Sequence, residues 1–121
     1  MNIQQLAADV AASLPEPSWF VEGPEEEGAW YAIIKSPEGP TLHVAFLAHV
    51  VRGGRLRVMG RWPQAQIGER VTTFRPSDLG PYCIHMSPSK SAAQIARDIS
   101  RRLLPRYVPE WHAQKERAVA A

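Results

Sequence analysis

Apolar positions near the N-terminus recur at the spacing of an amphipathic helix. The residues that follow this three- and four-residue rhythm are Ile3, Leu6, Ala7, Val10 and Leu14. Pro15 comes directly after them, and proline disfavours a helix interior because it lacks an N–H group and its ring clashes with the preceding turn. The pattern therefore predicts an N-terminal helix that ends before Pro15.

A second amphipathic pattern lies within the stretch SPSKSAAQIARDISRRLLPRY, residues 87–107. Its apolar stripe consists of Ala92, Ile95, Ala96, Ile99 and Leu103. The opposite side of the same helix is polar and basic, and it consists of Lys90, Gln94, Arg97 and Arg101. One side is predicted to pack on a sheet, and the other either faces solvent or binds an anion.

The ends of this helix are marked by serine and proline. The helix is predicted to begin after either Ser87 or Ser91, and both alternatives stay open. Ser91 would form a capping box with Gln94. Pro105 predicts a stop one residue earlier, and Pro109 then opens a short last helix. We therefore expect a C-terminal helix pair.

Shorter apolar segments, separated by proline and glycine, predict strands between the helices. They are residues 18–23, 29–35, the two halves of 41–62, 71–74 and 82–87. Segment 29–35 has apolar residues on both faces, which favours an interior position in the sheet. With 121 residues, of which 45% are hydrophobic, the chain is predicted to form a single α+β domain over residues 1–121. We expect a mainly antiparallel sheet of four to six strands with an N-terminal helix and the C-terminal helix pair.

Two apolar runs flank Gly53-Gly54 in the stretch TLHVAFLAHVVRGGRLRVMGRW, residues 41–62. Both glycines tolerate positive φ, which favours a two-residue hairpin turn. With that turn, one face opposes Arg52 to Arg55, Val50 to Arg57, Ala48 to Met59, and Phe46 to Arg61. The other face is predicted to pack on the C-terminal helix through Leu47, Val51, Leu56 and Trp62.

Charge is distributed unevenly along the chain. Residues 1–51 contain seven acidic residues and one basic residue, for a net charge of −6, and residues 52–121 contain thirteen basic and five acidic residues, for +8. Such an asymmetry indicates a charged partner, or neutralisation of one half by the other within the fold. The acidic run Glu25, Glu26 and Glu27 is the candidate for internal neutralisation of the arginines, and both alternatives stay open.

Composition indicates a cytoplasmic protein with no membrane partner. Cys83 is the only cysteine, so no disulfide forms within the chain, and a reducing compartment is the simpler inference. The N-terminal segment lacks the basic region of a signal peptide. The longest uncharged run, GPTLHVAFLAHVV, is shorter than the roughly 20 apolar residues that a membrane helix needs.

Catalytic motifs are not apparent in the sequence. The chain has no glycine-rich phosphate loop and no G-x-S-x-G motif. Cys83 and His85 share a strand face, and we expect a packed cysteine and a hydrogen-bonded histidine there. The sequence therefore predicts a protein that is not an enzyme and that uses no cofactor or metal.

The segment IHMSPSKSAAQIARDISRRLLPRY, residues 84–107, resembles the closing strand and helix of small uncharacterised accessory proteins of bacteriophages, plasmids and related mobile elements. The resemblance covers about the last third of the chain. It implies an accessory role in a bacterial or phage cytoplasm, and it assigns no functional residues.

Two functions stay open at this point. In the first, an arginine-rich face binds nucleic acid or another polyanion through Arg52, Arg55, Arg57, Arg61, Arg97 and Arg101. Phe46 and Trp62, next to these arginines, are candidates for stacking on bases. In the second, the protein is an interaction module, either a homodimer through Phe46 and Met59 or an inhibitor of a host protein such as a defence component, with an acidic partner surface. Eleven of the fourteen basic residues are arginine, which favours the first function because the guanidinium group binds phosphate through two hydrogen bonds.

Overall fold

The fold is α+β, as the sequence predicts. The computed structural model describes residues 2–15, 18–24, 28–48 and 54–121. In chain order its elements are α1 (Ile3–Ser13), β1 (Phe20–Gly23), β2 (Tyr31–Lys35), β3 (Thr41–Leu47), β4 (Arg55–Gly60), β5 (Gln64–Ile67), β6 (Arg70–Thr73), a short 3-10 turn η1 (Gly80–Tyr82), β7 (Cys83–Met86), α2 (Ala92–Asp98), a π-helical segment η2 (Ile99–Leu103) and α3 (Leu104–Ala120).

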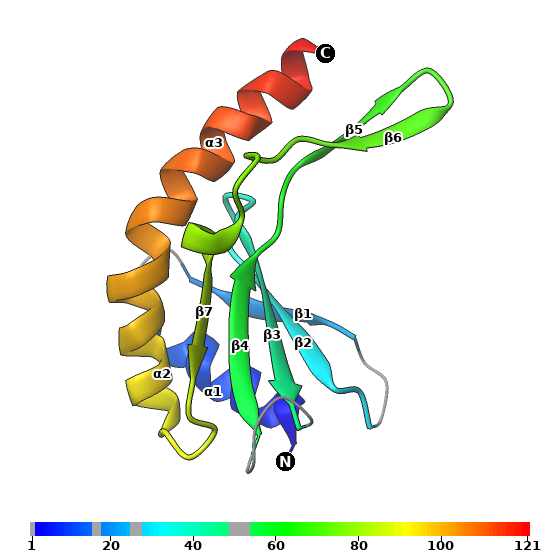
Figure 1. Ribbon diagram of the computed structural model, residues 1–121. Coiled ribbons are helices and arrows are strands. Elements are labelled where there is room, and N and C mark those ends of the chain that lie inside the picture. The colour runs from blue at the N-terminus through cyan, green and yellow to red at the C-terminus, as the bar shows by residue number, and fades with distance from the viewer. Residues whose placement is uncertain (1, 16–17, 25–27, 49–53) are drawn as a thin grey trace.

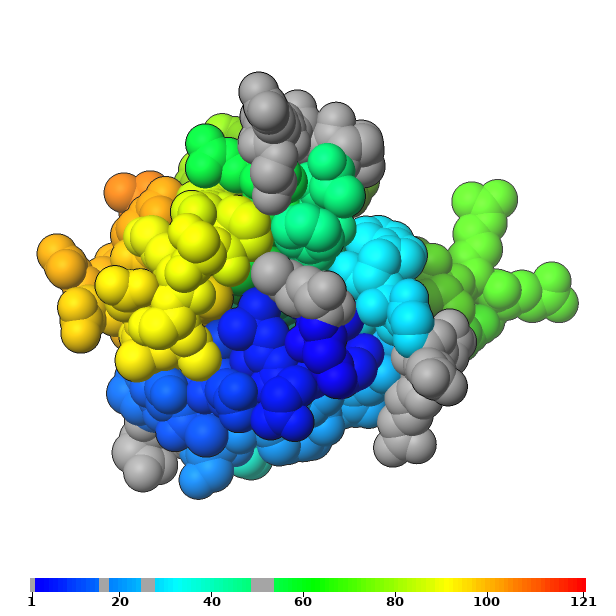
Figure 2. All heavy atoms as spheres, turned by 90° about the horizontal axis from the view of Figure 1, so that it is seen from below, coloured from blue at the N-terminus to red at the C-terminus, as the bar shows by residue number. Residues whose placement is uncertain are grey.

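Five strands form one antiparallel sheet, in the order β1-β2-β3-β4-β7 (Figure 1). Strands β5 and β6 form a separate hairpin that extends beyond the end of this sheet. Helices α1 and α2 lie side by side on the same face of the sheet, and the hairpin projects to one side of them (Figure 2). The five-stranded sheet is therefore covered by helices on one face.

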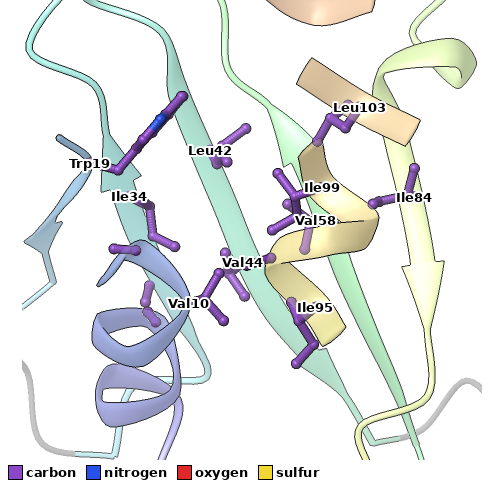
Figure 3. Close-up of a cluster of buried hydrophobic side chains, with 14 of the residues drawn as sticks. Val10, Trp19, Ile34, Leu42, Val44, Val58, Ile84, Ile95, Ile99 and Leu103 are labelled. Carbon is purple, nitrogen blue, oxygen red and sulfur yellow. The ribbon is translucent and has the colours of Figure 1, made fainter. Parts of the chain in front are cut away.

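The main hydrophobic core fills the space between the helices and this face. Figure 3 shows side chains of the central strands, among them Val44 and Val58, pointing toward Val10 of α1 and Ile95 of α2. All four side chains are completely inaccessible to solvent. Burying one such aliphatic side chain contributes about 1.5–3 kcal/mol, which makes this layer the main source of stability.

The C-terminal helix begins at the predicted capping box. The backbone N–H of Gln94 donates to Ser91 Oγ at 3.2 Å, and the N–H of Ser91 donates to Gln94 Oε1 at 2.9 Å. Four of the five residues of the predicted apolar stripe are buried, and Ala92 is partly buried. Of the two predicted starts, Ser91 and not Ser87 is therefore the N-cap, and the predicted buried side of this helix is confirmed.

The predicted break at Pro105 does not occur, and α2, η2 and α3 run on as one helix. The turn before Pro105 is π-helical, and the N–H of Leu104 donates to the carbonyl of Ile99, five residues earlier. This wider turn accommodates the proline ring, which would clash with the preceding turn of a regular α-helix. One long helix with an internal π-helical segment therefore replaces the expected helix pair.

The β3–β4 hairpin has a different register from the predicted one. Phe46 pairs with Leu56, Ala45 with Arg57, and His43 with Met59, so β3 is shifted by five residues against β4 relative to the two-residue turn. An odd shift exchanges the two faces of a strand because side chains alternate. Phe46 therefore lies on the core side of β3, and Leu47 lies on the other side.

Candidate nucleic-acid interface

The second face of the five-stranded sheet, called the uncovered face here, has none of the described helices packed on it. Strand alternation and register place on it Tyr31, Ile33, Lys35, His43, Ala45, Leu47, Arg55, Arg57, Met59, Arg61, Cys83 and His85. Figure 1 views the sheet from this side, with α1 behind the strands. The face is mostly polar and aromatic, whereas the face under the helices is apolar.

Three of the predicted anion-binding arginines lie together on the uncovered face. Arg55, Arg57 and Arg61 occupy alternate positions along and just beyond β4. The ion pairs among the described residues, Lys35 with Glu22 at 3.4 Å and Lys90 with Asp98 at 2.6 Å, do not involve these arginines. Arg52 and the acidic run 25–27 lie outside the described residues.

The other two predicted arginines do not join this group. Arg97 and Arg101 are exposed on the helix, which packs through Ile95 and Ile99 on the opposite face of the sheet. The sheet and the helix layer therefore separate Arg97 and Arg101 from Arg57. The sequence-based expectation of one combined arginine surface is wrong, because helix and strand contribute to opposite sides of the molecule.

The structure adds three rings that the sequence did not indicate as a site. Trp30, Tyr31 and His43, called the aromatic cluster, meet on the uncovered face. The rings of Tyr31 and His43 stack with centroids 4.9 Å apart and an interplanar angle of 14°. Trp30 contacts both edge to face, with centroid distances of 5.0 Å to Tyr31 and 5.8 Å to His43. The signal available in the sequence was the adjacency of Trp30 and Tyr31 at the start of a strand.

The aromatic cluster and two of the arginines line one shallow cavity of about 400 Å³. Its walls are formed by Trp30, Tyr31, His43, Arg57, Met59 and Arg61. Two polar atoms of these residues, His43 Nδ1 and Arg57 Nε, are buried and have no hydrogen-bond partner among the described residues. Buried polar atoms normally have a hydrogen-bond partner, so these two, together with Trp19 Nε1 elsewhere in the molecule, are exceptions among the described residues.

Burial and the nearby positive charges of Arg57 and Arg61 lower the pKa of His43. The imidazole is therefore neutral at neutral pH and adds no charge of its own to the cavity. The positive charge of the cavity comes from the two guanidinium groups, with the aromatic cluster beside them.

The two predicted interface residues have different positions. Met59 lies on the arginine face, as predicted, and contributes to the cavity wall. Phe46 does not, because the register places it on the core side. Trp62, the other candidate for base stacking, packs edge to face against Tyr82 and Tyr107 at 5.1 and 5.2 Å.

Cys83 and His85 share the uncovered face, opposite Met59 and Arg57. Burial raises the pKa of the Cys83 thiol, which keeps it protonated and disfavours a nucleophilic role. The described residues contain no group of three or more histidine, cysteine or acidic side chains arranged to bind a metal. Within the same residues, no helix combines the length and apolar character needed to cross a bilayer.

Comparisons with known proteins leave the uncovered face to be interpreted from its own residues. No family model, no curated protein and no solved structure matches the chain.

Proposed function

We propose that the protein binds nucleic acid through the uncovered face, without catalysing a reaction on it. The observation that supports this most directly is the group Arg55, Arg57 and Arg61 on an exposed sheet surface, outside the ion pairs of the described residues. Guanidinium groups that follow one strand in this way are suited to charge-assisted hydrogen bonds with successive phosphate groups. The accessory role in a mobile element implied by the resemblance of residues 84–107 is the setting that we propose for this binding.

A matched pair of charge variants tests the proposal. The sheet variant replaces Arg55, Arg57 and Arg61 with Ala, and the helix variant replaces Arg97, Arg101 and Arg102 with Ala. Both remove three positive charges from exposed or half-exposed positions, on opposite sides of the molecule. Fluorescence anisotropy with a labelled oligonucleotide at low salt should show strongly weakened binding for the sheet variant and a small loss for the helix variant. Equal losses, or undetectable binding by the native protein, would refute the proposal.

The alternative function, binding to an acidic protein surface, would use the same arginines. The two functions differ in the molecule that the protein binds, which is a nucleic acid in the first and an acidic protein in the second. If the native protein binds neither single- nor double-stranded oligonucleotides in low salt, nucleic-acid binding is excluded, and binding to an acidic protein becomes the better explanation.

A further inference from the structure

Trp30 is unusually exposed for a tryptophan. Its side chain is 56% exposed, whereas Trp19 and Trp111 are 7% and 8% exposed and Trp62 is half-buried. An exposed indole combines an apolar ring with a polar N–H group, and here it lies together with Tyr31 and His43 at one cavity. The exposed face of Trp30 is therefore free to stack on a flat, apolar group.

Two positively charged side chains, Arg57 and Arg61, lie beside this indole. Trp30, Arg57 and Arg61 line the same cavity, and the Nε atom of Arg57 is a buried donor with no partner among the described residues. An exposed indole beside two guanidinium groups is complementary to a ligand that carries an apolar ring and an anionic group close together. Nucleotides have both features, since each base is joined through its sugar to a phosphate.

A duplex does not present this combination, because its bases are stacked on one another inside the double helix. A single strand does, since its bases are free to stack on aromatic side chains while basic residues follow the backbone. Building on the proposed function, we infer that the uncovered face binds single strands in preference to duplexes, with one base stacked on Trp30 and adjacent phosphates held by Arg57 and Arg61. The neutral imidazole of His43 supports the arrangement by extending the flat surface without adding charge.

The test compares three probes of equal length by fluorescence anisotropy: oligo-thymidine, a duplex, and a deoxyribose-phosphate strand that lacks bases. The native protein should bind oligo-thymidine more tightly than either of the others. Trp30→Ala should weaken oligo-thymidine binding by about 5- to 150-fold, the range expected for one stacked base, and leave binding of the baseless strand unchanged. Trp30→Phe should retain much of the affinity because the phenyl ring also stacks.

Phe20 provides the matched control. It is also an exposed aromatic residue, at 45%, and its pairing with Lys35 places it on the uncovered face but on the edge strand β1. Phe20→Ala should therefore change oligo-thymidine binding far less than Trp30→Ala does. Unfolding midpoints close to that of the native protein will show that both variants are folded, as expected for exposed side chains.

The outcomes separate this inference from the proposed function. If the native protein binds none of the three probes, the proposed function itself is wrong. If it binds all three equally and Trp30→Ala has no effect, the face binds phosphate backbones and the inference about single strands is wrong. Equal weakening by Trp30→Ala on the baseless strand and on oligo-thymidine would also overturn it.

Discussion

The ring of Tyr107 in α3 packs against Gly60 at the end of β4 so closely that no side chain fits between them. A Cβ atom on Gly60 would lie 2.3 Å from Cδ1 of Tyr107. The Tyr107 hydroxyl accepts a hydrogen bond from the backbone N–H of Thr41 at 3.0 Å, and it is within donating distance of the carbonyls of Thr41 and Arg61. Tyr107 thus fixes the long helix against the start of β3 and the end of β4, on the core side of the sheet.

Gly60→Ala should destabilise the protein because the new methyl group overlaps the Tyr107 ring, which is completely buried and cannot move aside. We expect a loss of about 1–3 kcal/mol in the free energy of unfolding, measured by urea denaturation. Gly80→Ala is the control, since a Cβ there would meet only Oδ1 of the exposed Asp78 side chain, at 3.2 Å. Equal stability of the two variants would show that Tyr107 is not packed as described.

Ile99→Ala should cost about 2–4 kcal/mol because Ile99 is fully buried between the π-helical segment and the sheet. The denaturation midpoint measures this loss. Arg97→Ala, two residues earlier on the exposed side of the same helix, should change stability by less than about 0.5 kcal/mol. An unchanged midpoint for Ile99→Ala would mean that the helix is not docked on the sheet.

Phe46 and Leu47 are neighbours on β3 that point to opposite faces of the sheet. Phe46→Glu places a carboxylate against the core and should destabilise the fold by about 3 kcal/mol or more. Leu47→Glu lies on the uncovered face and should cost less than about 1 kcal/mol. Denaturation of both variants measures the difference. A larger loss of stability for Leu47→Glu than for Phe46→Glu would instead support the register predicted from the Gly53-Gly54 turn.

Self-association can be tested with Leu47 and Met59, which both lie on the uncovered face. A homodimer through the uncovered face should be disrupted by Leu47→Glu and by Met59→Glu, because each substitution places a carboxylate in the interface. Sedimentation at several concentrations measures the oligomeric state. A native protein that stays monomeric throughout would exclude the homodimer.

The pH dependence of stability should contain a contribution from His43. Its pKa is below the ordinary value of 6.5 in the folded state, because of burial and the charges of Arg57 and Arg61. As pH falls below about 6.5, the unfolded chain therefore takes up this proton first, and the free energy of unfolding decreases until the lower folded-state pKa is passed.

His43→Phe isolates this contribution, since phenylalanine keeps a ring beside Tyr31 but binds no proton. Between neutral pH and about pH 5, the native protein should lose more stability than His43→Phe does, as measured by urea denaturation. Identical losses would show that His43 does not titrate below its ordinary value in the folded protein.

The sequence predicted the elements of the fold better than their pairing. The buried side of the C-terminal helix followed from its apolar spacing, whereas its start stayed open between Ser87 and Ser91, of which the structure has Ser91 as the cap. The register of the β3–β4 hairpin did not follow from the sequence, because Gly53-Gly54 predicts a two-residue turn that places Phe46 on the wrong face. Pairing the more apolar alternation of each strand, which includes Val44 and Phe46 in one and Leu56 and Val58 in the other, gives the observed faces, although it leaves registers that differ by two residues equivalent.

The site was only partly predictable for a related reason. Arg57 and Arg61 share a strand, so strand alternation alone placed them together. Trp30 and His43 belong to different segments and meet only through the β2–β3 pairing, which no local pattern reveals. Arg97 was assigned to the same surface because charge composition does not show on which side of a sheet a helix packs.

The most direct test of the account is a proton–nitrogen correlation spectrum recorded while an oligo-thymidine is added to the native protein. The side-chain Nε–H signal of Arg57 and the indole N–H signal of Trp30 report on the cavity, and that of Arg97 reports on the helix side. We predict that the first two signals shift with a common saturation curve while that of Arg97 stays in place. Shifts confined to Arg97, or no shift of Arg57 and Trp30 at saturating oligonucleotide, would contradict binding at the uncovered face.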